Sequence, residues 1–413
     1  MSTTRKTPKL RFPEFTDDWE QRKLSDISER VTRKNKNLEY SLPLTISAQY
    51  GLVDQHEFFN KRIAAKDVSG YYVIKNGEFA YNKSYSEGYP WGAVKRLDRY
   101  ENGVLSTLYI LFSVKNVDSD FLVSYYDTNN WHSEVQQRSA EGARNHGLLN
   151  ISASDFFDTE LVIPQDPNEQ KKIGLLFKKL DSTITLHQRE LDSLKKLKKS
   201  LLQKMFPKNG EKIPELRFPE FTGDWEQRKL SDYLFTSKEK NVNNKYGRKD
   251  VYSVSGEFGV VNQIEFQGRS FAGKTLDGYD VIHKGEVVYT KSPLKSNPYG
   301  IIKTNKRETG IVSTLYAVYK PKDTCFANFV EDYFNSDSRT NRYLSPLISK
   351  GAKNTINVSD DKALDGIVIF PSTEEQRKIS TYFEKLNNLI TLHQRELDTL
   401  KKLKKGLLQN MFV

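Results

Sequence analysis

Residues Glu169–Phe206 read EQKKIGLLFKKLDSTITLHQRELDSLKKLKKSLLQKMF, and residues Glu375–Phe412 read EQRKISTYFEKLNNLITLHQRELDTLKKLKKGLLQNMF. In both copies apolar residues recur in steps of three and four, which is the spacing of a helix that packs against another helix. A helix with one such apolar stripe needs a partner, and the economical partner is the other copy. We therefore predict two long helices that pair as an antiparallel coiled coil about a two-fold axis.

One seam residue in each predicted helix is a histidine among apolar residues. A polar residue in such a seam fixes the register of a coiled coil, and this is our interpretation of both histidines. A metal pair and a pH switch are the alternatives for the same two residues. The predicted seam comprises Phe177, Leu180, Ile184, His187, Leu191 and Leu194 in the first helix and Phe383, Leu386, Ile390, His393, Leu397 and Leu400 in the second.

A second sequence is also repeated, once in each half of the chain. KLRFPEFTDDWEQRKLSD (Lys9–Asp26) returns as ELRFPEFTGDWEQRKLSD (Glu215–Asp232), and we call each copy a box. The stretch PKNGEKIP joins the halves, and its Pro and Gly residues mark a linker. We predict an internal pseudo-two-fold repeat with these parts: a box plus first domain over 1–166, a first spacer helix over 167–206, a linker over 207–214, a second box plus second domain over 215–372, and a second spacer helix over 373–413.

The regions between box and helix, Ile27–Val162 and Tyr233–Val368, are related but have diverged. VIKNGEFAYNKS in the first corresponds to VIHKGEVVYTKS in the second, and YGLVDQHEF (from Tyr50) corresponds to FGVVNQIEF (from Phe258). Short runs of β-branched and aromatic residues, separated by Gly, Asn and Asp, predict strands and turns. We therefore predict an α+β fold in which two β-rich domains with different surfaces alternate with two long helices.

The charge of the chain favours polyanionic partners. Its 413 residues carry a net charge of +11. The two helical segments supply most of it, because 168–206 holds ten basic and four acidic residues and 374–412 holds eight and five. The KKLKK run in each segment suits DNA phosphates or an acidic partner surface, and equally the solvated C-terminal end of a helix, whose dipole favours cations.

Other features of the composition exclude several classes of protein. No apolar run is long enough to span a membrane, and the N-terminal residues lack the apolar core of a signal peptide. Cys325 is the one cysteine, and no Cys/His cluster has zinc spacing. We therefore expect a cytoplasmic protein without an internal disulfide or a structural metal.

The repeated motifs resemble those of a known family, the specificity subunits of type I restriction–modification systems. The resemblance covers nearly the whole chain, and the doubled layout is its most specific part. It rests on the WEQRKLSD boxes, on the GARN and GAKN loops that lead into VIP and VIFP, and on EQKKI and EQRKI at the start of each long helix. The wording of the boxes is most similar to that of staphylococcal members.

The resemblance implies a non-catalytic protein that binds double-stranded DNA. In this family two target recognition domains bind a bipartite sequence, and two conserved helices act as a spacer. A 39-residue helix would span roughly 58 Å, enough to set two readers over half-sites about 34–36 Å apart. The implied partners are two methyltransferase subunits, which methylate adenine, and two restriction subunits, which translocate DNA. The chain itself is expected to bind no cofactor, with S-adenosylmethionine, ATP and Mg²⁺ belonging to the partners.

Matched positions in the two diverged regions are the candidates for DNA contact. Lys and Ser at the ends of two matched predicted strands would bind phosphates. Arg or Lys followed by Asn, after the Gly-Ala of two matched loops, would suit guanine and adenine. The alternative is that these loops are ordinary turns before the closing strand. The candidates are Lys83, Ser84, Tyr85, Lys291 and Ser292 at the strand ends, and Arg138, Arg144, Asn145, Lys350, Lys353 and Asn354 at or near the loops.

Two other classes of function compete with DNA recognition. GRSFAGKT (Gly268–Thr275) fits the pattern of a phosphate-binding loop, which would make the chain an NTPase. That motif requires a helix after it, whereas a glycine and the strand-like VIHKGEVVY follow here, so we interpret it as an ordinary loop. The remaining class is a duplicated scaffold that binds other proteins or carbohydrate.

Overall fold

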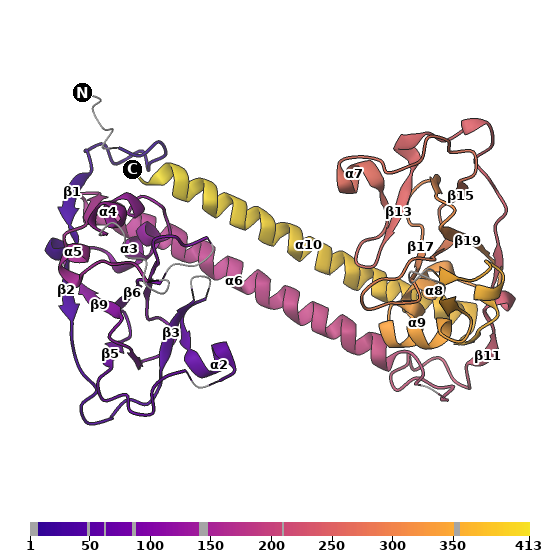
Figure 1. Ribbon diagram of the computed structural model, residues 1–413, viewed down its shortest axis with the longest axis horizontal. Coiled ribbons are helices and arrows are strands. Elements are labelled where there is room, and N and C mark those ends of the chain that lie inside the picture. The colour runs from indigo at the N-terminus through magenta and orange to yellow at the C-terminus, as the bar shows by residue number, and fades with distance from the viewer. Residues whose placement is uncertain are drawn as a thin grey trace. The chain divides into compact units, whose positions relative to one another are not determined.

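The computed structural model describes residues 7–47, 50–61, 63–84, 88–139, 148–208, 210–350 and 356–413. The chain forms two compact units (Figure 1), Met1–Gln188 with Arg395–Val413, and Arg189–Gln394. Each unit contains one strand-rich domain and one stretch of each long helix. The division between the units therefore runs across the helices.

The first domain is built on a four-stranded antiparallel sheet in the order β2-β9-β6-β7. These strands are β2 (Ser28–Val31), β9 (Tyr109–Val114), β6 (Phe79–Asn82) and β7 (Ala93–Arg96). The other described strands form antiparallel pairs: β1 (Glu20–Lys23) with β10 (Glu160–Ile163), β3 (Leu44–Ser47) with β4 (Gly51–Asp54), and β5 (Tyr72–Lys75) with β8 (Asn102–Leu105). Its described helices are α1 (Leu24–Ile27), α2 (Gln55–Phe59), α3 (Ser119–Tyr126), α4 (His132–Arg138) and α5 (Ala153–Phe157).

The second domain repeats this topology with the sheet order β12-β19-β16-β17. These strands are β12 (Leu234–Thr236), β19 (Tyr316–Pro321), β16 (Val287–Thr290) and β17 (Ile302–Thr304). The described strand pairs are β11 (Glu226–Lys229) with β22 (Ile367–Phe370), β13 (Tyr252–Ser255) with β14 (Gly259–Asn262), β15 (Asp280–Ile282) with β18 (Gly310–Val312), and β20 (Ser349–Lys350) with β21 (Ile356–Asn357). Its described α-helices are α7 (Gln263–Gln267), α8 (Ala327–Phe334) and α9 (Asp337–Leu344).

Both faces of the central strand β6 are buried, because successive side chains of a strand point to opposite sides. Phe79 and Tyr81 face one apolar cluster, and Ala80 between them faces another. In the first cluster the ring of Tyr81 stacks on that of Phe156, with 4.3 Å between centroids. β16 repeats the arrangement in the second domain, which explains why both stretches read as β-branched and aromatic runs.

A glycine after the central strand is required in both domains. Gly92 and Gly300 have φ angles of 80° and 91°. A Cβ atom would lie 2.1 Å from the carbonyl oxygen of Asn82 at the first position and 1.9 Å from that of Thr290 at the second. Each glycine thus lets the returning chain pack directly on the end of the central strand.

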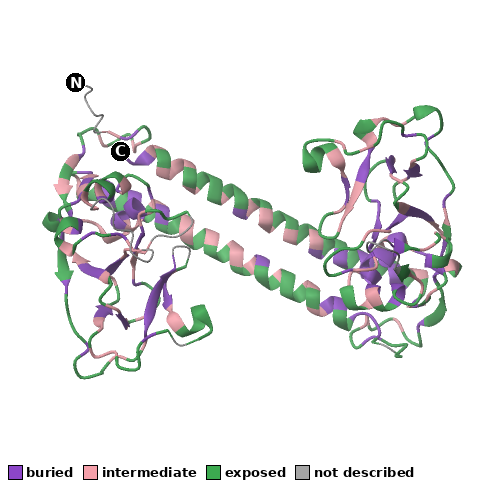
Figure 2. Ribbon diagram, viewed as in Figure 1, coloured by how far each residue is buried: buried purple, intermediate pink, exposed green. Residues whose placement is uncertain are grey.

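The two long helices are α6 (Pro167–Lys204) and α10 (Thr373–Met411), and they pair antiparallel within each unit (Figure 1). In the first unit Lys404 of α10 lies 2.6 Å from Asp181 of α6, measured from Nζ to Oδ1. In the second unit the ring of Phe206, just after α6, stacks 6.0 Å from that of Phe383 in α10. The predicted seam residues of both helices are buried or half buried (Figure 2), which confirms the predicted coiled coil.

An aromatic residue after the last turn of each helix enters the core of a domain. Phe206 contacts the rings of Trp225 and Phe329 in the second unit. Its counterpart Phe412 contacts the rings of Trp19, Phe121 and Phe177 in the first. The end of each helix is thus fixed inside the domain that belongs to the other half of the sequence. No helix among the described residues combines the length and apolarity needed to cross a membrane.

Candidate nucleic-acid interface

The start of each long helix is held to a box by a buried ion pair. Nε and Nη2 of Arg11 donate to the two carboxylate oxygens of Glu169 at 2.7 and 2.8 Å, and the indole of Trp19 donates to the same carboxylate at 3.3 Å. The Glu169 side chain is 1% exposed. Arg217 and Glu375 repeat the bidentate pair with both distances at 2.8 Å. The box therefore binds the Glu-Gln pair that begins EQKKI or EQRKI, which we call the EQ motif, and this contact is present in both units.

The glutamine of each EQ motif ties the helix to the domain. The side-chain oxygen of Gln170 accepts from the backbone N–H of Asp118 at the start of α3, and its amide nitrogen donates to the carbonyl of Pro164, both at 2.8 Å. Gln376 makes the matching bonds to Phe326 and Pro371 at 2.9 Å. The domain therefore takes the same position on the helix start in both units, whatever its variable loops contain.

One lysine of each KKLKK run is drawn into a domain. Lys404 donates to Asp127 at 2.8 Å in the first unit, and Asp127 also pairs with Lys95 at 2.7 Å. Burial acts to raise the pKa of Asp127, but the charges of Lys95 and Lys404 outweigh it and the pKa is lowered. The remaining lysines of both runs are exposed.

In the second unit, different acidic residues lie near the matching lysine. Lys198 corresponds to Lys404, but Asn335 stands where the first unit has Asp127. The acidic groups come from α8, where Glu331 and Asp332 lie near Lys198 and contribute to its electrostatic environment. Burial raises the pKa of Asp332 to about 7, and Glu331 adds to the effect. The two units therefore conserve the lysine while the domains supply different counter-charges.

In the first domain the strand-end candidates Lys83 and Ser84 lie next to the described segment that begins at Leu148, three residues after GARN in the sequence. Leu149 donates its backbone N–H to the carbonyl of Lys83 at 2.9 Å, and Ser84 forms a bridge with Leu148. Nζ of Lys83 donates to a carbonyl at 3.3 Å, that of Ile151. The strand end and the segment after the loop are thus neighbours. Tyr85, Arg144 and Asn145 lie outside the described residues.

The candidate Arg138 lies in the last turn of α4. Its guanidinium donates to the carboxylate of Glu134 at 2.6 Å, one turn earlier in the same helix. A phosphate or a base would therefore have to compete with Glu134 for this side chain.

In the second domain the candidate Lys291 also has a protein partner. Its ammonium group donates to Asp360 at 2.8 Å, and the side chain is 18% exposed. Ser292 follows it and is half buried. Lys350 ends β20 and pairs through its backbone with Ile356 of β21, so this strand pair brackets the GAKN stretch. Lys353 and Asn354 lie outside the described residues.

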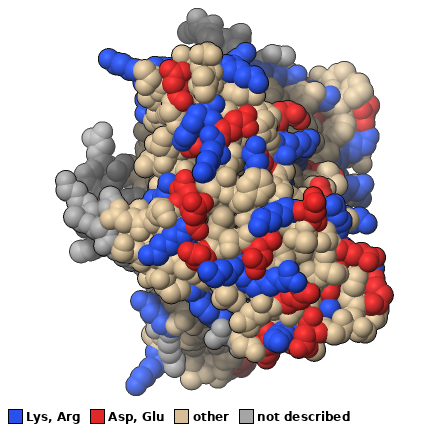
Figure 3. Space-filling view, turned by 90° about the vertical axis from the view of Figure 1, so that its right-hand side faces the viewer, with Lys and Arg blue, Asp and Glu red and all other residues tan. Residues whose placement is uncertain are grey.

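The distribution of charge does not single out a broad basic patch on the face seen in Figure 3. Lys and Arg side chains alternate there with Asp and Glu. In the second domain Lys291, Arg307 and Lys320 form ion pairs with carboxylates. The net charge of +11 is therefore not gathered into one basic patch on this face.

The phosphate-loop pattern Gly268–Thr275 does not have the required structure. Gly268 ends α7 with a φ of 74°, and Lys274 is exposed. Among the described residues the segment after Thr275 forms a turn and then β15, so no helix N-terminus follows the motif. The arrangement supports the interpretation as an ordinary loop and gives the NTPase alternative no structural basis.

Each long helix also carries exposed leucines that the seam analysis did not single out. Leu186 and Leu197 of α6 are about half exposed, and so are the matched Leu392 and Leu403 of α10. Leucines 11 residues apart lie on the same side of a helix, because 11 residues make about three turns. The sequence repeats this pair of exposed leucines at matched positions of the two helices, outside the heptad seam.

Comparison with known proteins gives a consistent result. No protein-family model matches the chain. A protein of Methanocaldococcus jannaschii, provisionally named the type I restriction enzyme MjaX specificity subunit, is 23% identical over 427 aligned positions that cover 97% of this chain and 94% of the relative. The crystal structure of a type I restriction–modification S subunit from M. genitalium has a TM-score of 0.61 at 13% identity, covering 98% of this chain and 99% of that one.

The fold defines a class of internally duplicated proteins in which two strand-rich domains are joined to a pair of antiparallel helices. Within that class, the chain is similar over nearly its whole length to a protein that is named as a specificity subunit of a type I restriction enzyme, and it shares the fold of a type I restriction–modification S subunit. The similarity of its boxes to staphylococcal members stays a prediction.

Proposed function

We propose that the chain is the DNA-recognition subunit of a type I restriction–modification complex and binds a bipartite double-stranded target. One domain recognises each half-site. One observation carries the proposal. The ion pair between box and helix is the same in both units, whereas the regions between box and helix have diverged in sequence. A duplicated frame with two different surfaces suits a target made of two different half-sites.

The candidates Lys83, Ser84, Lys291 and Ser292 remain part of this proposal as phosphate contacts at the strand ends. In the free protein the ammonium group of Lys83 donates to a backbone carbonyl and keeps its charge, whereas that of Lys291 pairs with an aspartate. DNA binding would require Lys291 to exchange Asp360 for a phosphate, or to hold both. The GARN and GAKN candidates Arg144, Asn145, Lys353 and Asn354 are proposed to contact bases from their loops. Tyr85, Arg138 and Lys350 remain candidates for DNA contact near those loops.

The chain is further proposed to act without catalysis of its own and to dock partner proteins. The same pair of exposed leucines occurs in each of the two helices, so the helices would offer matched surfaces to a methyltransferase subunit present in two copies. Restriction subunits would join the same complex. Adenine methylation with S-adenosylmethionine, and DNA translocation with ATP and Mg²⁺, would belong to those partners.

The test is a base-resolution map of N6-methyladenine in cells that carry the cognate methyltransferase, with and without this chain. We expect a gapped two-part motif that appears only when the chain is present. Equal maps from the two cell lines, with both proteins folded and expressed, would overturn the proposal.

Exchange of one domain tests the assignment of one half-site to each domain. Replacing Ile27–Val162 by the corresponding region of another family member should change one half of the methylated motif and leave the other half as it was. The matched exchange of Tyr233–Val368 serves as the control and should change the opposite half. A change in both halves after a single exchange would contradict the two-reader arrangement.

A further inference from the structure

Each domain displays an exposed apolar cluster at the same place in its fold. The cluster lies on a hairpin, the short helix after it and the segment that follows, which we call the hairpin–helix element and define as the described residues 44–47, 50–61 and 63–66 of the first domain and 252–274 of the second. In the first domain Tyr50 is 60% and Phe58 45% exposed. In the second domain the matched Phe258 is 60% and Phe266 48% exposed. Large apolar side chains exposed together, twice, indicate a binding surface.

The helix of the element starts with the same kind of cap and ends in the same way in both copies. The helix is capped by Asp54 in the first domain and by Asn262 in the second, whose side-chain oxygens accept backbone N–H bonds at 2.7 and 3.0 Å. It ends at a left-handed residue, Asn60 with φ 50° and Gly268 with φ 74°. The Gly of GRSFAGKT is therefore a helix terminator, and the phosphate-loop pattern is the second copy of NKRIAAKD.

After the left-handed residue, matched positions carry a cation and then an exposed apolar side chain. The cation is Lys61 in the first copy and Arg269 in the second. The apolar residue is Ile63, 47% exposed, and Phe271, 56% exposed. The guanidinium of Arg269 lies over the ring of Phe271, 4.6 Å from its centroid. The exposed apolar side chains are thus presented together with positive charge.

The second copy carries two acidic residues beside its two cations, and Glu257 is exposed next to Phe258. Glu265 of α7 pairs with Arg307 at 2.7 Å. Lys274 is exposed at the end of the element, and a lysine also stands at the matched position of the first copy. A surface that combines exposed aromatic or aliphatic side chains with cations suits nucleic acid, where cations bind phosphates and apolar groups contact sugars, thymine methyl groups and base edges.

We propose that the hairpin–helix element of each domain enters a groove of the DNA half-site recognised by that domain. Lys61 and Arg269 hold a phosphate beside the groove, and the side chains at positions 58, 63, 266 and 271 pack against sugars and base edges. The difference between Ile63 and Phe271 makes the element a contributor to the different preferences of the two domains. This inference rests on the proposed function, since it names the DNA-contacting surface of the same domains.

The experiment uses the full chain with its methyltransferase and duplexes that carry the mapped motif, or that motif with one half-site scrambled. Phe266→Ala with Phe271→Ala should weaken binding to the intact duplex about tenfold. The double variant should also lose most of its discrimination against a scrambled second half-site and keep that against a scrambled first one. Phe58→Ala with Ile63→Ala should do the converse. Phe235→Ala, an exposed phenylalanine of β12 in the second domain, is the matched control and should bind as the unmodified chain does.

Charge reversal gives a second measurement that does not depend on the apolar contacts. Arg269→Glu should weaken binding to every duplex. It should also reduce the slope of log Kd against log salt concentration by about one, the share of one phosphate contact. An unchanged salt dependence, together with binding by the double variant within about twofold of the unmodified chain, overturns the inference while leaving the proposed function intact.

The remaining outcomes separate DNA from a protein partner and from failure of the proposed function. The altered side chains are exposed, so the thermal unfolding midpoint should not move. Loss of co-purification with the methyltransferase in the double variant would mean that the element docks protein, which also overturns the inference. Absence of sequence-specific binding by the unmodified complex would instead overturn the proposed function.

Discussion

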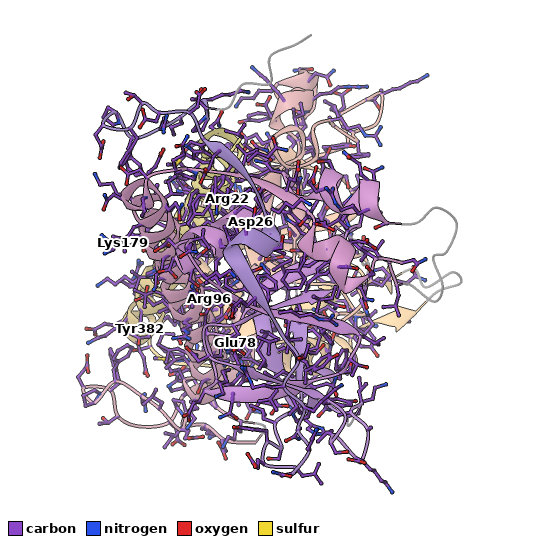
Figure 4. All side chains as sticks on the ribbon, turned by 90° about the vertical axis from the view of Figure 1, so that its left-hand side faces the viewer. Arg22, Asp26, Glu78, Arg96, Lys179 and Tyr382 are labelled. Atoms are coloured by element: carbon purple, nitrogen blue, oxygen red, sulfur yellow. The ribbon has the colours of Figure 1, made fainter. Side chains whose placement is uncertain are left out.

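At the residue scale, a buried charge pair has a different weight from an exposed one. Glu169 is 1% exposed and uses both carboxylate oxygens on Arg11, whereas Arg22 pairs with Glu20 at 3.0 Å on the surface, close to Asp26 (Figure 4). Removing one partner of a buried pair leaves an uncompensated charge away from water. We therefore expect substitution of Arg11 to lower the stability of the protein much more than substitution of Arg22.

Arg11→Ala should lower the free energy of unfolding by about 3–5 kcal/mol, because it leaves Glu169 buried without a counter-charge. Urea denaturation at neutral pH measures the change. Arg22→Ala is the matched control and should cost less than about 1 kcal/mol. Equal changes in the free energy of unfolding would show that the buried ion pair between box and helix contributes no more to stability than the surface pair.

The raised pKa of Asp332 makes the free energy of unfolding depend on pH. Burial raises its pKa from 3.8 to about 7, so the folded chain keeps a proton that the unfolded chain has lost between these values. Stability contributed by this group therefore falls as pH rises from about 4 to about 7, and the loss is complete above pH 7.

Asp332→Asn should consequently raise the free energy of unfolding at pH 8 by about 2–4 kcal/mol and have little effect at pH 4. Urea denaturation across this pH range gives the comparison. Asp323→Asn, at an exposed position of the same domain, should leave the pH profile unchanged. A gain of equal size at both pH values would contradict a raised pKa.

At the scale of elements, each long helix has a buried apolar seam and two exposed leucines outside it. The seam side is buried against the other helix within each unit, while the leucines at 186, 197, 392 and 403 face solvent. A helix that is amphipathic toward its partner and still exposes matched leucines is suited to a second helix-binding partner.

Leu186→Glu with Leu392→Glu should weaken co-purification with the methyltransferase at least about tenfold, because a charge replaces an apolar contact at both copies of the surface. Thr185→Glu with Thr391→Glu adds the same charges at neighbouring exposed positions and should have little effect. If both double variants retain the partner equally well, this surface is not where it docks.

At the scale of the whole molecule, the helices are proposed to set the gap between half-sites. Repeating one heptad in α6 and one in α10 would preserve the apolar seam and add about 10 Å to each helix. The mapped motif should then have a gap longer by up to about three base pairs, at about 3.4 Å per pair. An unchanged gap would show that another part of the molecule measures it.

Much of the fold could be predicted because its determining patterns are local. The heptad spacing from Phe177 to Leu194 requires a buried partner, and its repetition from Phe383 supplies one. The β-rich character of the domains follows from runs such as FAYN and VVYT, in which at least three successive side chains are buried. The candidate site was less predictable: the phosphate-binding role proposed for Lys291 takes no account of Asp360, which lies 69 positions away in sequence.

The sequence by itself determined the duplication, the two long helices and the division of each half into a constant frame and a variable region, since repeats and periodicity can be seen without long-range contacts. Only the tertiary structure decided that Glu169 and Glu375 close a joint with the boxes, and that Lys198 and Lys404 enter the domains. It alone decided that GRSFAGKT belongs to an exposed hairpin–helix element. The physical reason is that burial and counter-charge depend on which distant residues the fold brings together.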